Sequence, residues 1–195
     1  YRWERYDSKG KKPPSGWKKR YSEAEAPNVP EDFVGLPETW KWVSLDQVLI
    51  EDLRNGKSVR SREGGFPVMR LTAIDGGVID PEENKEGDWT REDAEKFIIE
   101  KGDFFVARGN GSLRLVGRGG LVEKEPPDVA FPDTMIRVRV HKDKFLPDFF
   151  RIIWHSRLVR NHIETTARTS AGIYKVNQGD LRSTVLPLPP LPEQK

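Results

Sequence analysis

The chain has 195 residues, of which 35% are hydrophobic and 33% are charged, a length that suggests one domain with an attached segment. Its six tryptophans and nine phenylalanines exclude a disordered chain, because such side chains can form a packed core. The lack of cysteine excludes a disulfide scaffold and a thiolate zinc site, and no apolar run approaches membrane-spanning length. We therefore expect a cytoplasmic protein with no membrane partner and, since the chain lacks an initial methionine, a piece of a longer protein.

The net charge of +2 conceals a strong segregation of charge along the chain. Residues 1–20 carry eight Lys/Arg against two acids, whereas residues 79–104 carry ten acids against four bases. Basic residues also dominate the stretches 54–71, 105–120 and 151–175. This segregation predicts one basic and one acidic face, and a basic face makes a polyanion the first partner to consider. The alternative is that each run is solvated surface charge.

Residues 1–35 differ in composition from the rest of the chain. Residues 1–6 are typical of the last turns of a helix, and the glycines and prolines of residues 9–16 end it. The polar, proline-containing stretch that follows is typical of an extended connector. We therefore expect a helical and extended linker over residues 1–35, followed by a compact domain over residues 36–195.

The compact domain is predicted to begin with a short helix and to continue mainly as strands. Ser44 and Gln47 have the spacing of a capping box, apolar residues recur at helical spacing as far as Leu53, and Asn55-Gly56 is expected to end this helix. Later in the chain, strands are predicted over residues 66–72, 78–79, 103–107, 113–122, 134–140, 173–176 and 184–188, with a turn at Gly76-Gly77 before the second of them.

Three further predictions complete the fold. Thr90 is expected to cap a short acidic helix over residues 91–97. Arginines alternate with apolar residues over 134–140, as in a half-buried strand. The longest helix is predicted to begin at Pro147 and to reach Ile163 without a break. Together, the elements predict an α+β fold that is mixed and rich in strands, with a few helices.

A glycine-rich stretch at residues 109–120 superficially resembles a phosphate-binding loop. The sixth position of the dinucleotide fingerprint is Arg114 instead of glycine, a strand is predicted to follow, and no Gly-Lys-Ser/Thr ending is present. We instead expect a β-turn at Gly109-Asn110-Gly111 that presents Arg108, Asn110 and Arg114 outward.

These residue types suit DNA, because arginine pairs bidentately with guanine and asparagine with adenine in the major groove. Residues 168–172 and 57–62 form two more exposed, basic loops rich in small polar residues. Three such loops on a strand-rich scaffold predict a DNA-reading surface. Its candidate residues are Lys57, Arg60, Arg62, Arg108, Asn110, Ser112, Arg114, Arg118, Arg168, Thr169, Ser170 and Lys175.

Catalytic patterns are weak in this sequence. His155 and His162 lie seven residues apart on the predicted long helix, without a third metal ligand. Asp75 with residues 83–85 resembles a nuclease motif only weakly, and neither the tetrapeptide of an adenine-methylating site nor a nucleophile elbow is present. We therefore expect no enzyme activity, no metal and no cofactor in this chain.

Several segments together resemble a target-recognition domain of type I restriction–modification specificity subunits. The order and spacing of these segments over residues 36–195 carry the resemblance. The segments that carry the resemblance are Leu-Pro-Glu-Thr-Trp at 36–40, Pro-Val-Met-Arg at 67–70, Lys-Gly-Asp-Phe-Phe-Val-Ala-Arg at 101–108 and the proline-rich exit at 186–194. Residues 2–18 resemble the end of the family's central spacer, which implies the second of two recognition domains, ending at the start of a missing spacer helix.

The resemblance implies a non-catalytic protein that reads one half of a split, asymmetric site in double-stranded DNA. Separate methyltransferase subunits would bind S-adenosylmethionine and methylate adenine, and a restriction subunit would cleave unmethylated DNA; ATP and Mg²⁺ would belong to those partners. Three alternatives stay open: the recognition domain of a single-chain restriction–methylation enzyme, a protein-interaction module that uses the acidic stretch 79–104, and an independent Mg²⁺-dependent nuclease.

Overall fold

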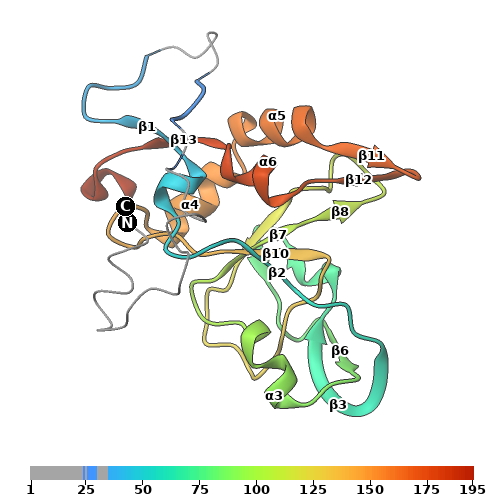
Figure 1. Cartoon of the computed structure of the whole chain (residues 1–195). Coiled ribbons are helices and arrows are strands. Elements are labelled where there is room, and N and C mark those ends of the chain that lie inside the picture. The colour runs from blue at the N-terminus through green and yellow to red at the C-terminus, as the bar shows by residue number, and fades with distance from the viewer. Residues whose placement is uncertain (1–23, 25, 30–34) are drawn as a thin grey trace, which may run out of the picture.

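The computed structural model of the protein describes residues 24, 26–29 and 35–195 (Figure 1). Most of the predicted linker, residues 1–23, 25 and 30–34, lies outside the described residues. In the described part the strands form four small sheets accompanied by a few helices, so the predicted α+β class is confirmed. No helix of that part is long and apolar enough to cross a bilayer.

The centre of the domain is a six-stranded sheet. Its strand order is β2-β10-β7-β9-β5-β4, with β5 parallel to β9 and the other neighbours antiparallel. The strands are β2 (Arg54–Asn55), β4 (Ile74–Asp75), β5 (Val78–Ile79), β7 (Phe104–Ala107), β9 (Gly119–Leu121) and β10 (Met135–Val138). The turn that the sequence predicted at Gly76-Gly77 connects β4 to β5, and both glycines have positive φ.

Strand β7 divides the core into two layers. Successive side chains of a strand point to opposite faces, so Phe104 and Phe105 belong to different hydrophobic clusters. Phe104 packs edge-on against Phe150 and Trp154 of the helical layer, at ring centroid distances of 5.0 and 5.6 Å. On the opposite face Phe105 contacts Phe131 at 4.9 Å. The central sheet is therefore covered on both faces.

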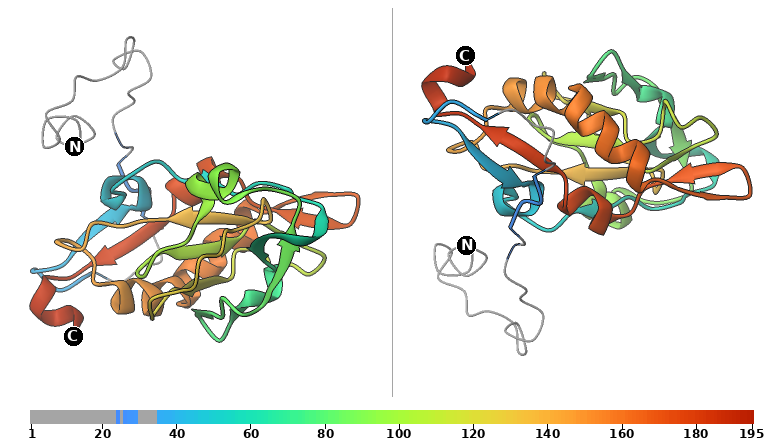
Figure 2. Two further views of the ribbon diagram at one scale, coloured as in Figure 1. Left: turned by 90° about the horizontal axis from the view of Figure 1, so that it is seen from below. Right: turned by 90° about the horizontal axis from the view of Figure 1, so that it is seen from above.

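The helical layer consists of α4 (Pro147–Trp154) and α5 (Arg157–Thr166), which lie along one side of the sheet (Figures 1 and 2). The predicted start at Pro147 is confirmed, but the prediction of one continuous helix is wrong. Ser156 lies between the two helices in extended conformation, and its Oγ accepts a hydrogen bond of 3.4 Å from the Val159 N–H. A capping serine thus begins a second helix.

A two-stranded sheet brings the two ends of the domain together. Strand β1 (Lys41–Ser44) pairs antiparallel with β13 (Val185–Leu188), which confirms the strand predicted over residues 184–188. The chain ends in a 3₁₀ turn, η4 (Leu191–Gln194), where the Gln194 side chain accepts from the Leu146 N–H at 2.8 Å and donates to the Lys144 carbonyl oxygen at 2.7 Å. The proline-rich exit is therefore tied to the start of α4.

The predicted helix over residues 45–54 is wrong in type and length. A 3₁₀ helix, η1 (Leu45–Val48), follows β1, and Gln47 closes the predicted box by accepting from the Ser44 N–H at 2.9 Å. The chain then becomes extended, and β2 pairs with β10. Pairing with the sheet edge overrides the local helical pattern here.

A separate lobe, formed by residues 57–73 and 80–97, contains the antiparallel pair β3 (Ser61–Met69) and β6 (Asn84–Gly87), and the chain between these strands passes through β4 and β5 of the central sheet. Strand β3 forms a two-stranded antiparallel sheet with β6, so the strand predicted at 66–72 begins earlier than expected. The 3₁₀ turn η2 (Leu71–Ala73) follows β3, and α3 (Arg91–Ala94) continues into η3 (Glu95–Phe97). The predicted cap is confirmed, since Thr90 Oγ1 accepts from the Asp93 N–H at 3.3 Å.

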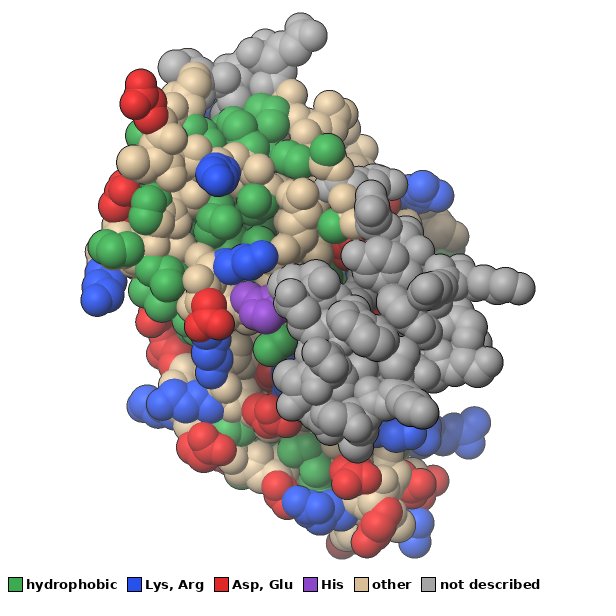
Figure 3. All heavy atoms as spheres, turned by 60° about the vertical axis from the view of Figure 1, so that its left-hand side comes forward, with side chains coloured by type: hydrophobic (Ala, Val, Ile, Leu, Met, Phe, Trp, Pro, Cys, Tyr) green, Lys and Arg blue, Asp and Glu red, His purple; other side chains and the backbone are tan. Residues whose placement is uncertain are grey.

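The distribution of side chains over one face matches this division. Figure 3 shows charged side chains gathered over the lower part of that face, at the height of the β3–β6 lobe. Hydrophobic side chains gather over the upper part, at the height of β1 and β13. Lys/Arg and Asp/Glu side chains are mixed in that lower part, so this view does not show the separate basic and acidic faces that the sequence predicted.

Strand β10 is fully buried, which corrects the prediction of a half-buried strand. Arg137 is only 6% exposed, and its Nη2 lies 3.2 Å from Glu51 Oε1. Arg139, which follows the strand, makes two hydrogen bonds to the buried Asp103, one of them 3.0 Å long. Burial lowers the pKa of Arg139, but Asp103 outweighs it and raises the pKa above its usual value. Carboxylates therefore compensate the two arginines internally.

Candidate nucleic-acid interface

A three-stranded sheet brings two of the three predicted loops together. Its order is β11 (Arg168–Ser170), β12 (Ile173–Lys175) and β8 (Gly109–Asn110). The prediction of a turn at residues 109–111 is therefore wrong: Gly109 and Asn110 pair with Lys175 and Tyr174, and the turns lie at residues 111–117. Strand β9 is correspondingly shorter than the strand predicted over 113–122.

The β11–β12 hairpin, which we call the ribbon (residues 168–175), extends away from the body of the domain (Figures 1 and 2). Ala171 at its tip has φ +48° and Gly172 has φ +76°, which close a tight turn. A left-handed conformation is unfavourable for alanine, so the tip holds backbone strain. A narrow, exposed two-stranded ribbon has the dimensions of an element that enters the major groove of DNA.

The pairing of the ribbon decides which side chains share a face. Arg168 lies opposite Lys175 and Ser170 opposite Ile173, whereas Thr169 lies opposite Tyr174 on the other face. Like charges directly opposite each other destabilise a hairpin. Among residues 35–195, neither Arg168 nor Lys175 has an acidic partner within ion-pair distance, so the repulsion has no internal compensation.

Gly109 allows the edge strand β8 to approach this basic face. A Cβ at Gly109 would lie 3.3 Å from Cγ of Lys175 and 3.4 Å from the Tyr174 carbonyl oxygen, which is tighter than most Cβ contacts. Asn110 next to it uses its side chain locally, since Oδ1 accepts from the Ser112 N–H at 3.0 Å. Its amide nitrogen has no partner within the described chain and is available to an external acceptor.

The segment after β8 carries two more of the predicted residues, and we call it the arginine loop (residues 111–118). Arg114 and Arg118 are exposed, and no hydrogen bond or ion pair from either side chain reaches another described residue. Arg108, which directly precedes β8, is half-buried and makes a long contact of 3.5 Å with the Asp133 carbonyl oxygen. Ser112 is half-buried beneath the turn.

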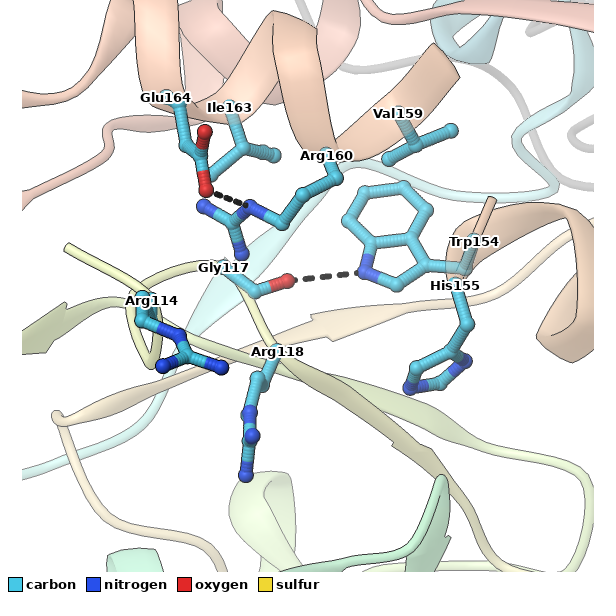
Figure 4. Close-up of a pocket in the computed structure, with 9 residues that line it drawn as sticks. All are labelled: Arg114, Gly117, Arg118, Trp154, His155, Val159, Arg160, Ile163 and Glu164. Carbon is cyan, nitrogen blue, oxygen red and sulfur yellow. Dashed lines mark hydrogen bonds and ion pairs between the residues drawn. The ribbon is translucent and has the colours of Figure 1, made fainter. Parts of the chain in front are cut away.

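Helices α4 and α5 hold the arginine loop by its backbone (Figure 4). Trp154 Nε1 donates to the Gly117 carbonyl oxygen at 3.0 Å. Arg160 donates to the carbonyl oxygens of Val116 at 2.7 Å and Leu113 at 3.3 Å. Gly117 itself has φ +71°, and a Cβ there would lie 2.5 Å from Cγ2 of Ile163. The loop is thus preorganised by residues from both helices.

A pocket of about 300 Å³, the arginine pocket, lies between this loop and the two helices (Figure 4). It is lined by Arg114, Gly117, Arg118, Trp154, His155, Val159, Arg160, Ile163 and Glu164. Glu164, its only acid, lies 3.0 Å from Nε of Arg160. Burial lowers the pKa of Arg160, Glu164 opposes this effect, and the positive charge of Arg118 adds to it. The pocket therefore holds an excess of positive charge.

A second hollow of about 310 Å³ adjoins the first, and Arg118 lines both. Its other lining residues come from the β8 region and from the η2–β4 segment: Leu71, Thr72, Ile74, Asp75, Ala107, Asn110 and Leu115. The free amide of Asn110 and the guanidinium of Arg118 therefore border the same concave surface. The two hollows extend the basic surface from the ribbon to the helices.

The third predicted loop belongs to the β3–β6 lobe. Nη1 of Arg62 lies 2.9 Å from Oδ1 of Asp88, and Nζ of Lys57 lies 5.9 Å from the centre of the Trp89 ring. Arg60 is exposed, and its carbonyl oxygen accepts from the Asp88 N–H at 2.8 Å. No sheet of the described chain joins this group to the ribbon.

The sequence analysis did not identify Trp154 and Arg160 as part of the site. Trp154 belongs to the apolar side of its helix, so periodicity assigns it to the core. Arg160 and Glu164 have the i, i+4 spacing of a helical ion pair, which indicates a surface pair in general. Neither local pattern identifies the loop that these residues hold, about 40 residues earlier in the chain.

The two histidines do not form a pair. His155 ends α4, with Nδ1 2.8 Å from the Arg151 carbonyl oxygen, whereas His162 of α5 lies 2.8 Å from the Asp180 carbonyl oxygen, next to α6 (Gln178–Arg182). Over residues 35–195 no group of three or more His, Cys, Asp or Glu side chains is arranged to hold a metal ion.

Comparison with known proteins identifies the family of this chain. A family model described as a type I restriction modification DNA specificity domain matches residues 37–195. The chain is 31% identical over 158 residues to the type I restriction enzyme EcoKI specificity subunit of Escherichia coli strain K12, covering 80% of this chain and 34% of that protein. It is 30% identical over 150 residues to the StySPI specificity subunit of Salmonella potsdam, covering 75% of this chain and 32% of that protein.

Solved structures show the same fold. The HsdS subunit from Thermoanaerobacter tengcongensis superimposes with a TM-score of 0.57 at 22% identity, over 84% of this chain and 41% of that chain. A structure described as the type I R-M system in assembly and conformational transition gives a TM-score of 0.58 at 19% identity, over 85% of this chain and 38% of that one. The chain spans about a third of the length of the curated relatives above. The resemblance found in the sequence is confirmed: the chain belongs to the family of type I restriction modification DNA specificity domains.

Proposed function

We propose that this chain is a target-recognition domain that binds double-stranded DNA in a sequence-specific manner and reads one half of a split, asymmetric site. The match of the family model to residues 37–195 carries this proposal. The surface chemistry supports it, because the ribbon and the arginine loop present cations without internal partners on adjoining elements. A polyanion supplies the missing negative charge.

Two parts of the surface suit two tasks. The ribbon is exposed and narrow, and Arg168, Ser170 and Lys175 share one of its faces, so this face suits entry into the major groove. The arginine loop lies in a recess beside the helices and suits contact with the DNA backbone. We propose that Asn110, Arg108, Ser112 and Thr169 border the groove, and that Lys57, Arg60 and Arg62 contact flanking backbone.

We further propose a division of labour with other proteins. Residues 36–195 would serve as the reader and residues 1–35 as the end of a spacer and a linker, and the remainder of a longer specificity subunit would hold a second reader. Methyltransferase subunits that carry S-adenosylmethionine, and a restriction subunit that uses ATP and Mg²⁺, would supply the chemistry in the cytoplasm. This reader has no catalytic role in our proposal, in keeping with relatives that are named specificity subunits.

Selection from a random duplex library tests the proposal. The immobilised chain is expected to enrich one short motif, corresponding to half of a split site, from duplexes with a random central region. A triple variant with Arg114, Arg118 and Arg168 each changed to glutamine serves as the control and is expected to enrich nothing. A wild-type chain that enriches no motif would contradict sequence-specific reading and would favour the interaction-module alternative. Duplex cleavage by the purified chain with added Mg²⁺ would favour the nuclease alternative.

A further inference from the structure

The arginine pocket contains more guanidinium charge than its own residues neutralise. Arg160 directs its Nη atoms to two backbone carbonyl oxygens, and its Nε lies beside Glu164. Arg114 and Arg118 line the same pocket without an acceptor in the described chain. Figure 4 shows both side chains on the side of the loop that faces away from α5. Two guanidinium groups therefore have free donors beside one cavity.

We propose that Arg114 and Arg118 form an oxyanion site for a tetrahedral phosphate group and that on DNA this site holds one backbone phosphate, not a base edge. The DNA part of this inference rests on the proposed function. It separates two of the predicted DNA-binding arginines from the base-reading role and assigns them to positioning the duplex.

The shape of the site favours a phosphate. An arginine that reads bases extends from an element that itself enters a groove, as the ribbon does. Arg114 and Arg118 instead border a recess of about 300 Å³ whose wall includes Trp154 and Val159 of the two helices. The planar guanidinium group binds phosphate oxygens in a bidentate manner, and two such groups supply enough donors for one phosphate.

The backbone of the loop is held before any ligand binds. The hydrogen bonds from Trp154 to Gly117 and from Arg160 to Val116 and Leu113 hold the segment 113–117, which includes Arg114 and ends just before Arg118. A loop whose backbone is already held loses less conformational freedom on binding an anion. Arg118 also borders the hollow that contains Asn110, so a phosphate held here would fix the register of the DNA strand against that amide.

Inorganic phosphate tests the site without DNA. The unfolding temperature of the whole chain is measured in phosphate and in chloride at equal ionic strength, for wild type, Arg114→Gln, Arg118→Gln and the control Arg91→Gln. Arg91 belongs to α3 of the β3–β6 lobe, is exposed, pairs with Asp128, and does not line the pocket. Phosphate stabilises folded proteins in general, so the difference between variants is decisive.

We expect phosphate to raise the unfolding temperature of wild type and Arg91→Gln by about 2 °C more than that of either pocket variant. An equal rise in all four proteins overturns the oxyanion site. The outcome does not depend on whether the chain binds DNA.

Salt titration of duplex binding tests the DNA part. Each phosphate contact contributes a slope of about 0.9 to the dependence of log K on log salt concentration. The double variant Arg114→Gln/Arg118→Gln, which removes both donors of the site, is expected to reduce the slope by about this amount and to weaken binding by the same factor on the selected motif and on random duplex. A changed motif with an unchanged slope overturns the assignment, because the arginine then reads a base.

Failure of the proposed function can be distinguished from failure of the oxyanion-site inference. If wild type binds no duplex at all, the proposed function fails and the DNA part of this inference fails with it, while the phosphate measurement still decides the oxyanion site. If wild type binds duplex but the pocket variants keep the wild-type slope and affinity, only the present inference fails.

Discussion

Trp154 and Gly117 are joined by a buried hydrogen bond of 3.0 Å from the indole Nε1 to the carbonyl oxygen, and this bond connects helix α4 to the loop that presents Arg114 and Arg118. The same indole packs against Phe104 at the centre of the sheet. One side chain therefore links the hydrophobic core to the proposed interface, so the geometry of the interface depends on the packing of the core.

Replacing Trp154 with phenylalanine tests this link. The variant keeps a large aromatic ring but leaves the buried Gly117 carbonyl oxygen without its donor, which is expected to cost about 1–3 kcal/mol of unfolding free energy. Because the loop is then held less firmly, duplex affinity should fall as well. Phe105→Leu, which changes the core on the opposite face of the sheet and leaves Trp154 in place, is the matched control. It should reduce stability without a separate loss of affinity when both are measured on folded protein.

A methyl group at Gly117 is expected to disrupt the same connection. The residue has φ +71°, and the new Cβ would lie 2.5 Å from Ile163, so both backbone strain and overpacking oppose Gly117→Ala. We expect a loss of about 2–4 kcal/mol in chemical denaturation. At Gly111, where a Cβ would meet nothing within 4 Å and φ is not positive, alanine should be tolerated. Equal stability of the two variants would contradict the described loop.

A single substitution in the ribbon should weaken duplex binding without lowering the free energy of unfolding. Arg168→Gln removes the repulsion with Lys175 on the opposite strand, so unfolding free energy should stay unchanged or rise by about 0.2–1 kcal/mol. Duplex binding should weaken, with a shallower salt dependence. Lys96→Gln, an exposed lysine of the β3–β6 lobe, should alter neither quantity. Loss of stability in Arg168→Gln would mean that Arg168 has a structural role.

Asp103 is expected to matter for folding alone. It is 2% exposed and accepts hydrogen bonds from Arg139, so Asp103→Asn leaves Arg137 and Arg139 with less compensation in a buried setting. We expect a loss of about 3 kcal/mol or more. Asp128→Asn, which removes an exposed partner of Arg91, should cost less than about 1 kcal/mol. Comparable losses in both would contradict the importance of burial here.

Residue type at single positions correctly predicted a cap, a helix start and a turn. The cap at Thr90, the start of α4 at Pro147 and the turn at Gly76-Gly77 each follow from residue type at one position. Errors occurred where distant pairing decides: residues 54–55 and 109–110 are strands because β10 and β12 offer them partners. Periodicity within a single segment contains no information about these partners.

The sequence predicted which residues belong to the candidate site better than it predicted how they are arranged. Arg114, Asn110 and Arg168 stood out as exposed polar and basic residues of loops, and the sheet brings the two loops together. Arg137 and Arg139 show the limit of charge counting, because they belong to a segment rich in arginine yet pair with Glu51 and the buried Asp103. Burial, which only the tertiary fold supplies, separates structural arginines from those available to DNA.

The most direct test of the central claim is a map of methylated adenines in cells that carry the full-length system, compared with cells in which residues 36–190 are replaced by another domain of the family. We predict that one half of a split motif changes while the other half and the adenine methylation persist. An unchanged motif in cells that still methylate would contradict the account, because the segment would then not read DNA.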